Sequence, residues 1–497
     1  MTLLLTLLAC DDTKISAEIP EDTGVPDTAL TDTADTDDTD TVPGGVDSDS
    51  AAPTTPSKYA QVSDITVEVH PQIATILEVS WTQDVDADEA WLEFTFEDEG
   101  WLQSPPERRA AGRHSEVLLG SPPETEVQLR IANTIDGVTT YQRYDLFGTT
   151  GEIPGQLPDP ELLIHDPTLA GGERWLLGSV DADDAGWYGG PFWAFILDRQ
   201  GRYVWYQPVP DNRLALQVQP AWDGGHVVYE GSTWYVWDDT IQPTVTRTTL
   251  DQSRYEAETV EGMGFTLDEI EGGHLLYVDV TYDEGGQEQY ALVERDADGG
   301  ARTIWDCEAW LATALGGDEG DCIPNTIIWN PADDTVLWSM FLNDTVVEVD
   351  RQTGALLRQW GQLRESWAVD PPEAQLEYQH FPNYTADGTL LVSTHVEDED
   401  GVQVAREFRV DDATETLVEV WSYSSPDHYA RYGGEATPTA GGNVLISYGT
   451  DGAIAEITPG GEVAWELLIQ TSSHTHLVGH LTLLDDLYAL NEASTAD

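Results

Sequence analysis

The chain has almost no lysine and few cations of any kind. Lysine occurs only at Lys14 and Lys58, and 21 Lys and Arg residues together face 92 Asp and Glu, which gives a formal net charge of −71. Such a surface repels the phosphate backbone of nucleic acids and the anionic surface of a membrane. We therefore expect no nucleic-acid partner, and contact with a membrane only through a lipid anchor.

Long helical patterns are also missing. We find no long amphipathic segment, and no apolar run after the N-terminus is long enough to span a bilayer. The sequence instead has many short runs of β-branched and aromatic residues separated by glycine-containing turns, which is typical of strands. The 497 residues suffice for two or three domains. We therefore predict an all-β protein.

Cysteine is scarce, and the first of the three cysteines ends the opening segment MTLLLTLLAC. Leu7-Leu8-Ala9-Cys10 resembles a lipobox after a short apolar segment, although the usual basic residues are missing. We expect residues 1–10 to be a lipoprotein signal peptide, with Cys10 as the lipidated residue. The alternative is a chance cysteine after a leucine-rich start.

The following segment, residues 11–57, consists almost entirely of Asp, Thr, Pro, Ser, Gly and Ala. It cannot bury enough apolar surface to fold, and its like charges keep it extended. We predict a disordered acidic tether. Together with the lipidated cysteine, this predicts an exported, membrane-anchored protein that faces the periplasm or the cell surface.

The other two cysteines, Cys307 and Cys322, are separated by a short Gly/Asp-rich segment. In an exported protein such a pair predicts a disulfide, and the alternative is two free thiols. We expect no metal at this pair, because two cysteines so placed do not complete a metal site. The segment SHTHLVGH, with His474, His476 and His480, could bind a transition metal, but we favour a simple loop and predict no metal site.

Residues 58–150 contain short alternating runs that predict a β-sandwich. The runs are DITVEVH, ILEVSW, AWLEFTF, SEVLLG and EVQLRIAN. The stretch LLGSPPETEVQLRI resembles fibronectin type III domains, with Val127 at the position of that family's usual corner tyrosine. The resemblance implies a spacer or docking module.

Residues 160–497 contain six repeats, each with a tight turn followed by an apolar strand. The repeats are GGERWLLGSV, GGHVVYEGS, GGHLLYVDV, DDTVLWSMF, DGTLLVSTH and GGNVLISYG, and most continue with a second hairpin that ends near Trp. Two hairpins per repeat predict one four-stranded blade, so the repeats predict a six-bladed β-propeller closed by the last strand.

The innermost strand of each blade should precede the tight turn, with its entry end at one mouth of the central channel. Counting eight residues back from each turn gives equivalent positions at Ile164, Gln217, Phe265, Thr326, His380 and Gly434. Only His380 among them is a strong catalytic type.

Two segments, EYQHFPNYTADGTLLVSTH and NTIIWNPADDTVLWSMFLNDTVVEVDRQTGALLRQWG, resemble the bacterial arylsulfotransferase family of exported six-bladed propellers. In that family a histidine attacks the sulfur of an aryl sulfate and passes the sulfuryl group to a phenol. The resemblance implies that His380 is this nucleophile, and that Asn325 and the neighbouring Gln379 bind the substrate. No cofactor is implied.

The chain departs from the family's pattern at three positions. The expected histidine, arginine and His-Asp pair fall on Ile323, Phe341 and Phe265-Thr266. We hypothesise that Arg213 or Arg431 supplies the missing positive charge, the alternative being that both pair with surface carboxylates. Losing one preorganised donor typically costs about 10²–10³ in rate, so activity would be degraded unless other residues replace these groups.

Two functions therefore remain open, and whether the chain is an enzyme is not decided by its sequence. The first is an arylsulfotransferase-like transferase that works through His380. The second is a non-catalytic, surface-displayed propeller that binds a small aromatic or phenolic ligand, or a protein, at the channel mouth. The 18 Trp and 19 Tyr residues suit the second.

Overall fold

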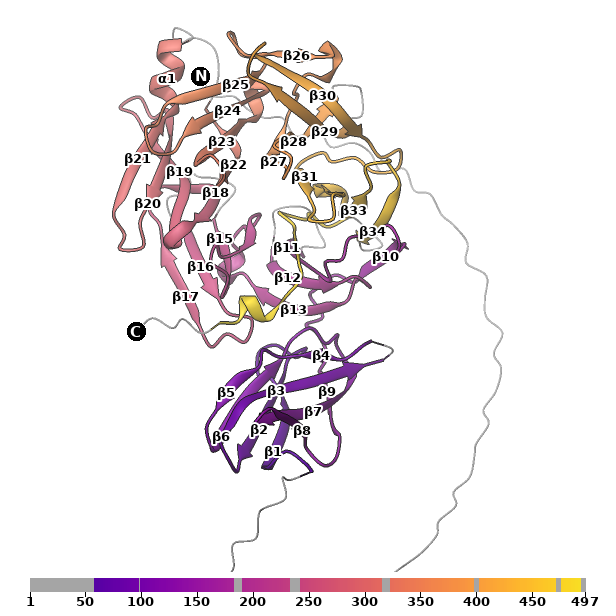
Figure 1. Cartoon of the computed structure of the whole chain (residues 1–497). Helices are drawn as coiled ribbons and strands as arrows, with labels where there is room; N and C mark the ends of the chain where they lie inside the picture. The colour runs from indigo at the N-terminus through magenta and orange to yellow at the C-terminus, as the bar shows by residue number, and fades with distance from the viewer. Residues whose placement is uncertain are drawn as a thin grey trace, which may run out of the picture. The chain divides into compact units, whose positions relative to one another are not determined.

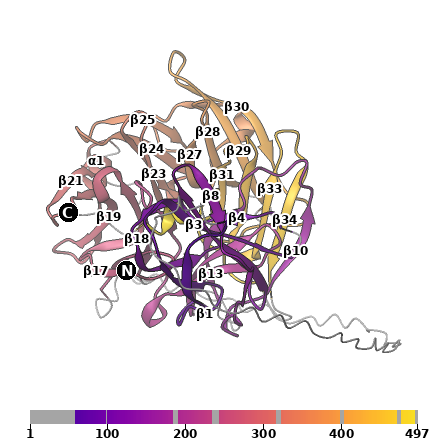
Figure 2. The same cartoon turned by 60° about the horizontal axis from the view of Figure 1, so that its bottom comes forward.

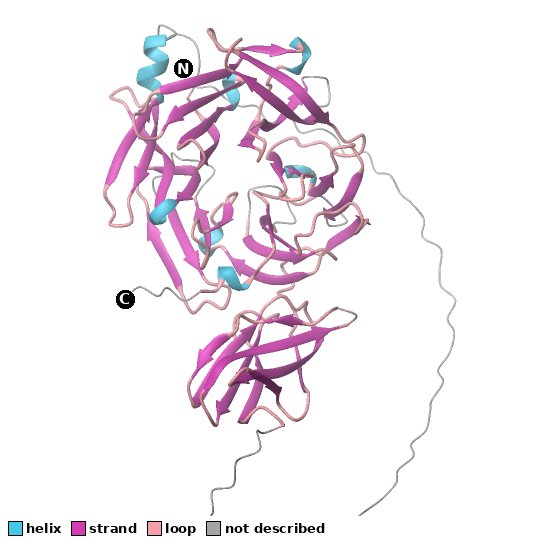
Figure 3. Cartoon of the chain, viewed as in Figure 1, coloured by secondary structure: helices cyan, strands magenta, loops and turns pink. Residues whose placement is uncertain are grey.

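The computed structural model describes residues 58–97, 99–182, 190–232, 242–314, 322–396, 402–470 and 475–492. The predicted signal peptide and tether lie outside these residues. Strands dominate the described part, as Figure 3 shows, and the longest helix is α1 (Cys307–Ala314). No helix within the described ranges is long and apolar enough to cross a bilayer. The all-β prediction is confirmed.

The first domain is a sandwich of two antiparallel sheets. One sheet has the order β1 (Val62–Val69), β2 (Leu77–Gln83), β6 (Gly112–Leu118). The other has the order β4 (Leu102–Gln103), β3 (Ala87–Phe96), β7 (Glu126–Ile135), β8 (Val138–Tyr141), with β5 (Glu107–Arg109) beside β3 and β9 (Leu146–Thr149) beside β7. Alternate side chains of the two sheets, including Trp81, Phe94 and Val127, form its core.

The second domain is a propeller whose blades follow chain order around a central axis (Figures 1 and 2). From the innermost strand outward, blade 1 consists of β35 (Thr482–Leu484), β11 (Trp175–Asp181), β12 (Phe192–Asp198) and β13 (Tyr203–Pro208). Blade 2 consists of β14 (Val218–Pro220), β15 (Val227–Gly231), β16 (Thr244–Thr248) and β17 (Tyr255–Thr259). Blade 3 consists of β18 (Met263–Ile270), β19 (His274–Tyr282), β20 (Glu288–Arg295) and β21 (Ala301–Asp306).

The other three blades have the same layout. Blade 4 consists of β22 (Pro324–Asn330), β23 (Thr335–Met340), β24 (Thr345–Asp350) and β25 (Leu356–Gly361). Blade 5 consists of β27 (His380–Tyr384), β28 (Leu390–Val396), β29 (Val402–Asp411) and β30 (Thr416–Tyr423), with β26 (Ala368–Asp370) added outside. Blade 6 consists of β31 (Gly434–Pro438), β32 (Val444–Tyr448), β33 (Ala453–Ile457) and β34 (Val463–Ile469), with β10 (Pro160–His165) added outside. The predicted six blades are confirmed.

The ring is closed at both ends of the domain. The late strand β35 takes the innermost place in blade 1, where Leu484 pairs with Trp175, and the early strand β10 covers the outer edge of blade 6. The predicted place of Ile164 on an innermost strand is therefore wrong, because Ile164 pairs with Glu466 in β34. The repeat turns reflect this difference: Gly225, Gly273, Asp334, Gly388 and Gly442 have positive φ, whereas Gly172 does not.

The predicted disulfide is present and joins the start of α1 to the segment before β22. The sulfur atoms of Cys307 and Cys322 are 2.02 Å apart, and both residues are buried in the hydrophobic core of blades 3 and 4. The bond closes the insertion that lengthens the third repeat. It thereby links the start of α1 covalently to the residue two positions before β22.

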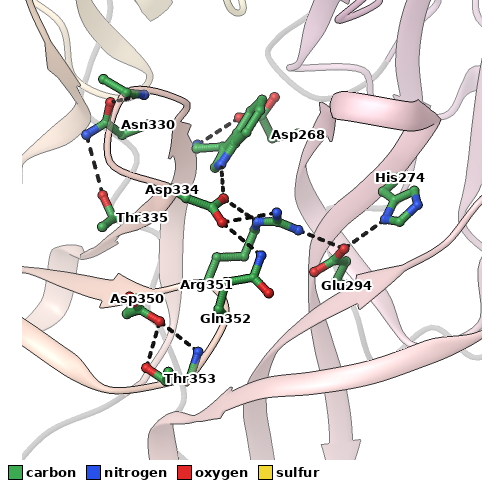
Figure 4. A network of polar contacts seen from close by, with 12 residues as sticks. Asp268, His274, Glu294, Asn330, Asp334, Thr335, Asp350, Arg351, Gln352 and Thr353 are labelled. Carbon is green, nitrogen blue, oxygen red and sulfur yellow. Dashed lines mark hydrogen bonds and ion pairs between the residues drawn. The ribbon is translucent and has the colours of Figure 1, made fainter.

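Arginines join neighbouring blades by pairing with carboxylates of the adjacent blade. Arg351, in the turn after β24 of blade 4, donates to Glu294 of blade 3 at 2.9 Å and also pairs with Asp334 (Figure 4). Three further arginines lie at other interfaces. The pairs are Arg247 with Glu269 between blades 2 and 3, Arg358 with Asp412 between blades 4 and 5, and Arg199 with Glu456 between blades 1 and 6.

We predict that Arg358→Gln lowers the free energy of unfolding by about 3 kcal/mol, measured by urea denaturation. Arg358 donates to Glu348, whose side chain is fully buried, so the substitution leaves a buried carboxylate without its cation. The matched control is Arg409→Gln, because Arg409 is 55% exposed and pairs only with Asp411. Equal losses in the two variants would contradict the role of the buried pair.

Candidate functional site

His380 begins β27, at the entry end of the innermost strand of blade 5. Its ring makes no hydrogen bond and no ion pair with any described residue. Burial, reinforced by the nearby His395, lowers the pKa of His380 to about 3, and burial lowers that of His395 to about 4. Both imidazoles are therefore neutral at physiological pH.

The backbone on each side of His380 is strained. Tyr378 and Phe381 have φ angles of 45° and 49°, in the left-handed region that bulky residues rarely adopt. The register of β27 against β28 shifts just after His380, and the N–H of Tyr378 donates to the carboxylate of Asp344 at 2.7 Å. Strain of this kind gathers at functional sites, where the surrounding structure holds a side chain in place.

Asn325 and Gln379 lie beside His380, as expected, and their contacts connect blades 4 and 5. The side-chain amide of Asn325 donates to the backbone carbonyl of Gln379. The side-chain amide of Gln379 donates to Ser339 Oγ and to the carbonyls of Met340 and Thr345, at 3.0 to 3.1 Å. These bonds set the position of His380, because they fix the residue immediately before it.

The two candidate arginines do not contact His380. Arg213 donates to the carbonyl of Gln242 at 2.6 Å and to Thr244 Oγ1 at 3.1 Å, both beside or within its own blade. Arg431 is exposed, and its guanidinium lies over the ring of Tyr432 at 5.5 Å. Among the described residues, no arginine makes a hydrogen bond or ion pair with His380.

Two of the positions counted back from the repeat turns are displaced by changes in strand register. In blade 6, Glu435 rather than Gly434 pairs with Ser447, in the way that His380 pairs with Ser393 and Thr326 with Ser339. In blade 3 the predicted position falls within a register shift between Met263 and Leu267. The side chains of Phe265 and Phe341 lie outside the described part, and Ile323 packs against the core of blades 3 and 4.

A cluster on the propeller axis was not predicted from the sequence. His480, which precedes β35, hydrogen-bonds Glu435 through Nδ1 at 2.6 Å and stacks on Phe381, with ring centroids 5.0 Å apart. Burial lowers the pKa of His480, but the negative charge of Glu435 outweighs it and the pKa is raised. Burial raises the pKa of nearby Asp268 to about 7.

The histidine segment before β35 is described at His476 and His480. His476 bonds the carbonyl of Asp181 at 2.9 Å, and His474 lies outside the described residues. Within the described ranges, no three His, Cys, Asp or Glu residues are placed to hold a metal ion. The sequence predicts that the last strand closes the ring, but not that it takes the innermost place in blade 1 beside β11, on which the position of His480 depends.

The comparisons with known proteins assign no family to the chain. No family model and no curated protein matches the chain. Among solved structures, it is similar to a protein of unknown function from Bacteroides caccae (15% identity, 63% of this chain and 100% of that chain, TM-score 0.41). It is also similar to the Pseudomonas aeruginosa periplasmic gluconolactonase PpgL (13%, 80% and 99%, TM-score 0.37) and to a streptogramin B lyase (13%, 65% and 97%, TM-score 0.35). Likeness at this level is limited to propeller architecture and says nothing of a reaction.

We predict that the His380 ring stays neutral between about pH 8 and pH 5 in NMR titrations of histidine-labelled protein. Because its folded-state pKa lies below the ordinary 6.5, its contribution to stability is present above about pH 6.5 and is lost as the pH falls towards 3.

His428 is the internal control for this titration. Its hydrogen bonds to Asp451 and Glu466, each 2.7 Å long, raise its pKa to about 9. Its signals should stay at the protonated limit over most of the same range. A midpoint near 6.5 for His380, assigned with His380→Gln, would show that the ring is not buried as described.

Proposed function

We propose that the protein binds a small, uncharged aromatic or phenolic ligand at the entry end of the propeller, with His380 as its polar contact. The observation that carries this proposal is the neutral ring of His380, which makes no hydrogen bond with any described residue and is held between the strained backbones of Tyr378 and Phe381. A neutral imidazole can both donate to and accept from a hydroxyl group. It thus suits a phenol better than an ion.

The surroundings support an uncharged ligand. Tyr378, Tyr429 and Tyr432 are 43%, 54% and 45% exposed, and they precede the innermost strands of blades 5 and 6. Such side chains offer aromatic faces and hydroxyl groups to a ligand. The carboxylates of Glu435 and Asp268 on the axis, and the net charge of −71, disfavour an anion.

Sulfuryl transfer through His380 is the second candidate, favoured by the neutral ring. A ring nitrogen would attack the sulfur of an aryl sulfate, the bond from sulfur to the aryl oxygen would break, and the phenolate would leave. A phenol oxygen would then attack the sulfur and break the bond to nitrogen. The transferred oxygens need positive or hydrogen-bonding groups, and the absence of an arginine contact to His380 among the described residues weighs against this candidate.

We test the binding proposal with 2-naphthol, a fluorescent phenol that is uncharged at neutral pH. We expect His380→Ala to weaken binding to the full chain about tenfold, because one hydrogen bond to the ligand is lost. His165→Ala is the matched control, since His165 lies on β10 and bonds Gln200. Absent binding, or equal affinity in wild type and His380→Ala, would contradict the proposal.

A second assay separates the two candidates. The protein is incubated with 4-nitrophenyl sulfate and a phenol acceptor, and release of nitrophenol is followed. If the protein only binds its ligand, as we propose, we expect no release of nitrophenol. Turnover that disappears in His380→Ala would replace the binding proposal with the transferase.

We also propose that the protein is exported and held at a membrane by lipid on Cys10. The lipobox-like segment and the acidic residues after it support this proposal. We predict that the chain produced in a bacterial host enters the detergent phase on phase separation, whereas Cys10→Ser stays in the aqueous phase. Identical partitioning of the two proteins would contradict lipidation.

A further inference from the structure

A pocket of about 470 Å³ lies between blades 2 and 3, beside the tight turns of the repeats and thus at the opposite ends of the innermost strands from His380. This volume is in the range of small-molecule sites. The chain has few cations, yet three of its arginines line this pocket: Arg247, Arg254 and Arg295. We call it the interblade pocket.

Two of these arginines hold the pocket together. Arg247 bonds Glu269 and Glu258, each at 2.7 Å, and Arg295 bonds Glu258 at 2.7 Å. The four groups connect β16 and β17 of blade 2 with β18 and β20 of blade 3. The two arginines and two glutamates of this network neutralise one another at short range. The network therefore forms one wall of the pocket and leaves no charge unpaired for a ligand.

The third arginine has a weaker partner and is available to a ligand. Among the carboxylates of the described residues, Arg254 bonds Glu256 alone, through two parallel hydrogen bonds of 3.2 Å, and Glu256 is 61% exposed. Because this pair is open to solvent, a ligand carboxylate can compete with Glu256 for the guanidinium. On the blade 2 side of the pocket, Asp223 is exposed and makes no hydrogen bond or ion pair with any described residue. The pocket thus offers one cation and one carboxylate that are both available.

His226 lies close to both groups. It is only 7% exposed and its Nδ1 is hydrogen-bonded to Arg254 at 3.5 Å. Its Nε2 makes no hydrogen bond with any described residue, and the nearest carboxylate oxygen, Oε1 of Glu269, is 3.6 Å away. The charges of both Arg254 and Asp223 act on its ring, so both lie close to it. A buried ring nitrogen without a hydrogen bond is costly unless something else satisfies it. It is therefore an independent sign that a ligand atom belongs here.

We propose that the interblade pocket binds a small zwitterion of amino-acid size, with its carboxylate on Arg254, its ammonium on Asp223 and a hydrogen bond to His226. A simple anion would face the acidic lining, and a simple cation would face three guanidinium groups. A zwitterion satisfies both charges. It also carries no net charge, so the acidic protein does not repel it at long range.

The experiment titrates the full chain with single free α-amino acids in a calorimeter. Two analogues of each amino acid are measured beside it: the N-acetyl derivative, which lacks the ammonium, and the amino alcohol, which lacks the carboxylate. We expect at least one amino acid to bind, and both of its analogues to bind about tenfold more weakly or not at all.

Variants locate the site. Arg254→Gln and Asp223→Asn should each weaken binding about tenfold, whereas Arg302→Gln, which alters an arginine outside the pocket, should not. His380→Ala should also leave this binding unchanged, which separates it from the proposed function. Thermal unfolding of every variant checks that the fold is retained. No binding of any amino acid by the wild type, or equal binding of the singly charged analogues, would overturn the proposal.

Discussion

The structure depends on bonds between arginine side chains and buried carboxylates where neighbouring blades meet. Backbone hydrogen bonds join the strands within a blade, and a few, such as that from Trp367 to the carbonyl of Gln359, also cross between blades. Side chains supply further bonds between adjacent blades. Glu269 and Glu456 are buried, with 2% and 0% of their side chains exposed, and each receives an arginine of the neighbouring blade, Arg247 and Arg199 respectively. A buried carboxylate without such a partner is strongly destabilising. Several of the few arginines of this chain therefore stabilise the fold by pairing with buried carboxylates between blades.

At other interfaces between blades, uncharged side chains donate the hydrogen bonds. Gln403 of blade 5 donates to the carbonyl of Ser447 in blade 6 at 3.0 Å, and the indole of Trp205 in blade 1 donates to the carbonyl of Leu250 in blade 2 at 2.8 Å. Apolar packing adds to these bonds, as between Trp360 of blade 4 and Phe408 of blade 5. The joints differ chemically, but each satisfies polar groups that the interface would otherwise bury unpaired.

Local sequence patterns were sufficient to predict the blades. A turn residue with positive φ followed by an apolar strand is a short-range signal, and it placed His380 at the start of an innermost strand. The disulfide could also be predicted from the sequence, because only two cysteines follow the tether. The misplaced Ile164 and the unrecognised His480 share one cause. Both depend on which strand pairs across the closure of the ring, and nothing near either residue indicates its partner.

The candidate site was predictable only in part for a related reason. The count from the turns placed His380, and the resemblance pointed to Asn325 and Gln379 beside it. The count missed Glu435 by one residue, because the hairpin of blade 6 is one residue shorter than that of blade 5. The lack of hydrogen bonds to the His380 ring could not be foreseen, since it depends on where every nearby donor is already engaged.

The double closure also constrains how the protein is made. Trp175 acquires its inner neighbour, Leu484, only when almost the whole chain exists. Until then the inner edge of β11 is an open template for pairing with other chains. Contacts so distant in sequence form late, because a large loop must close first. During synthesis the propeller is therefore an open ring, and the unpaired edge of β11 is a place where copies of the chain can associate.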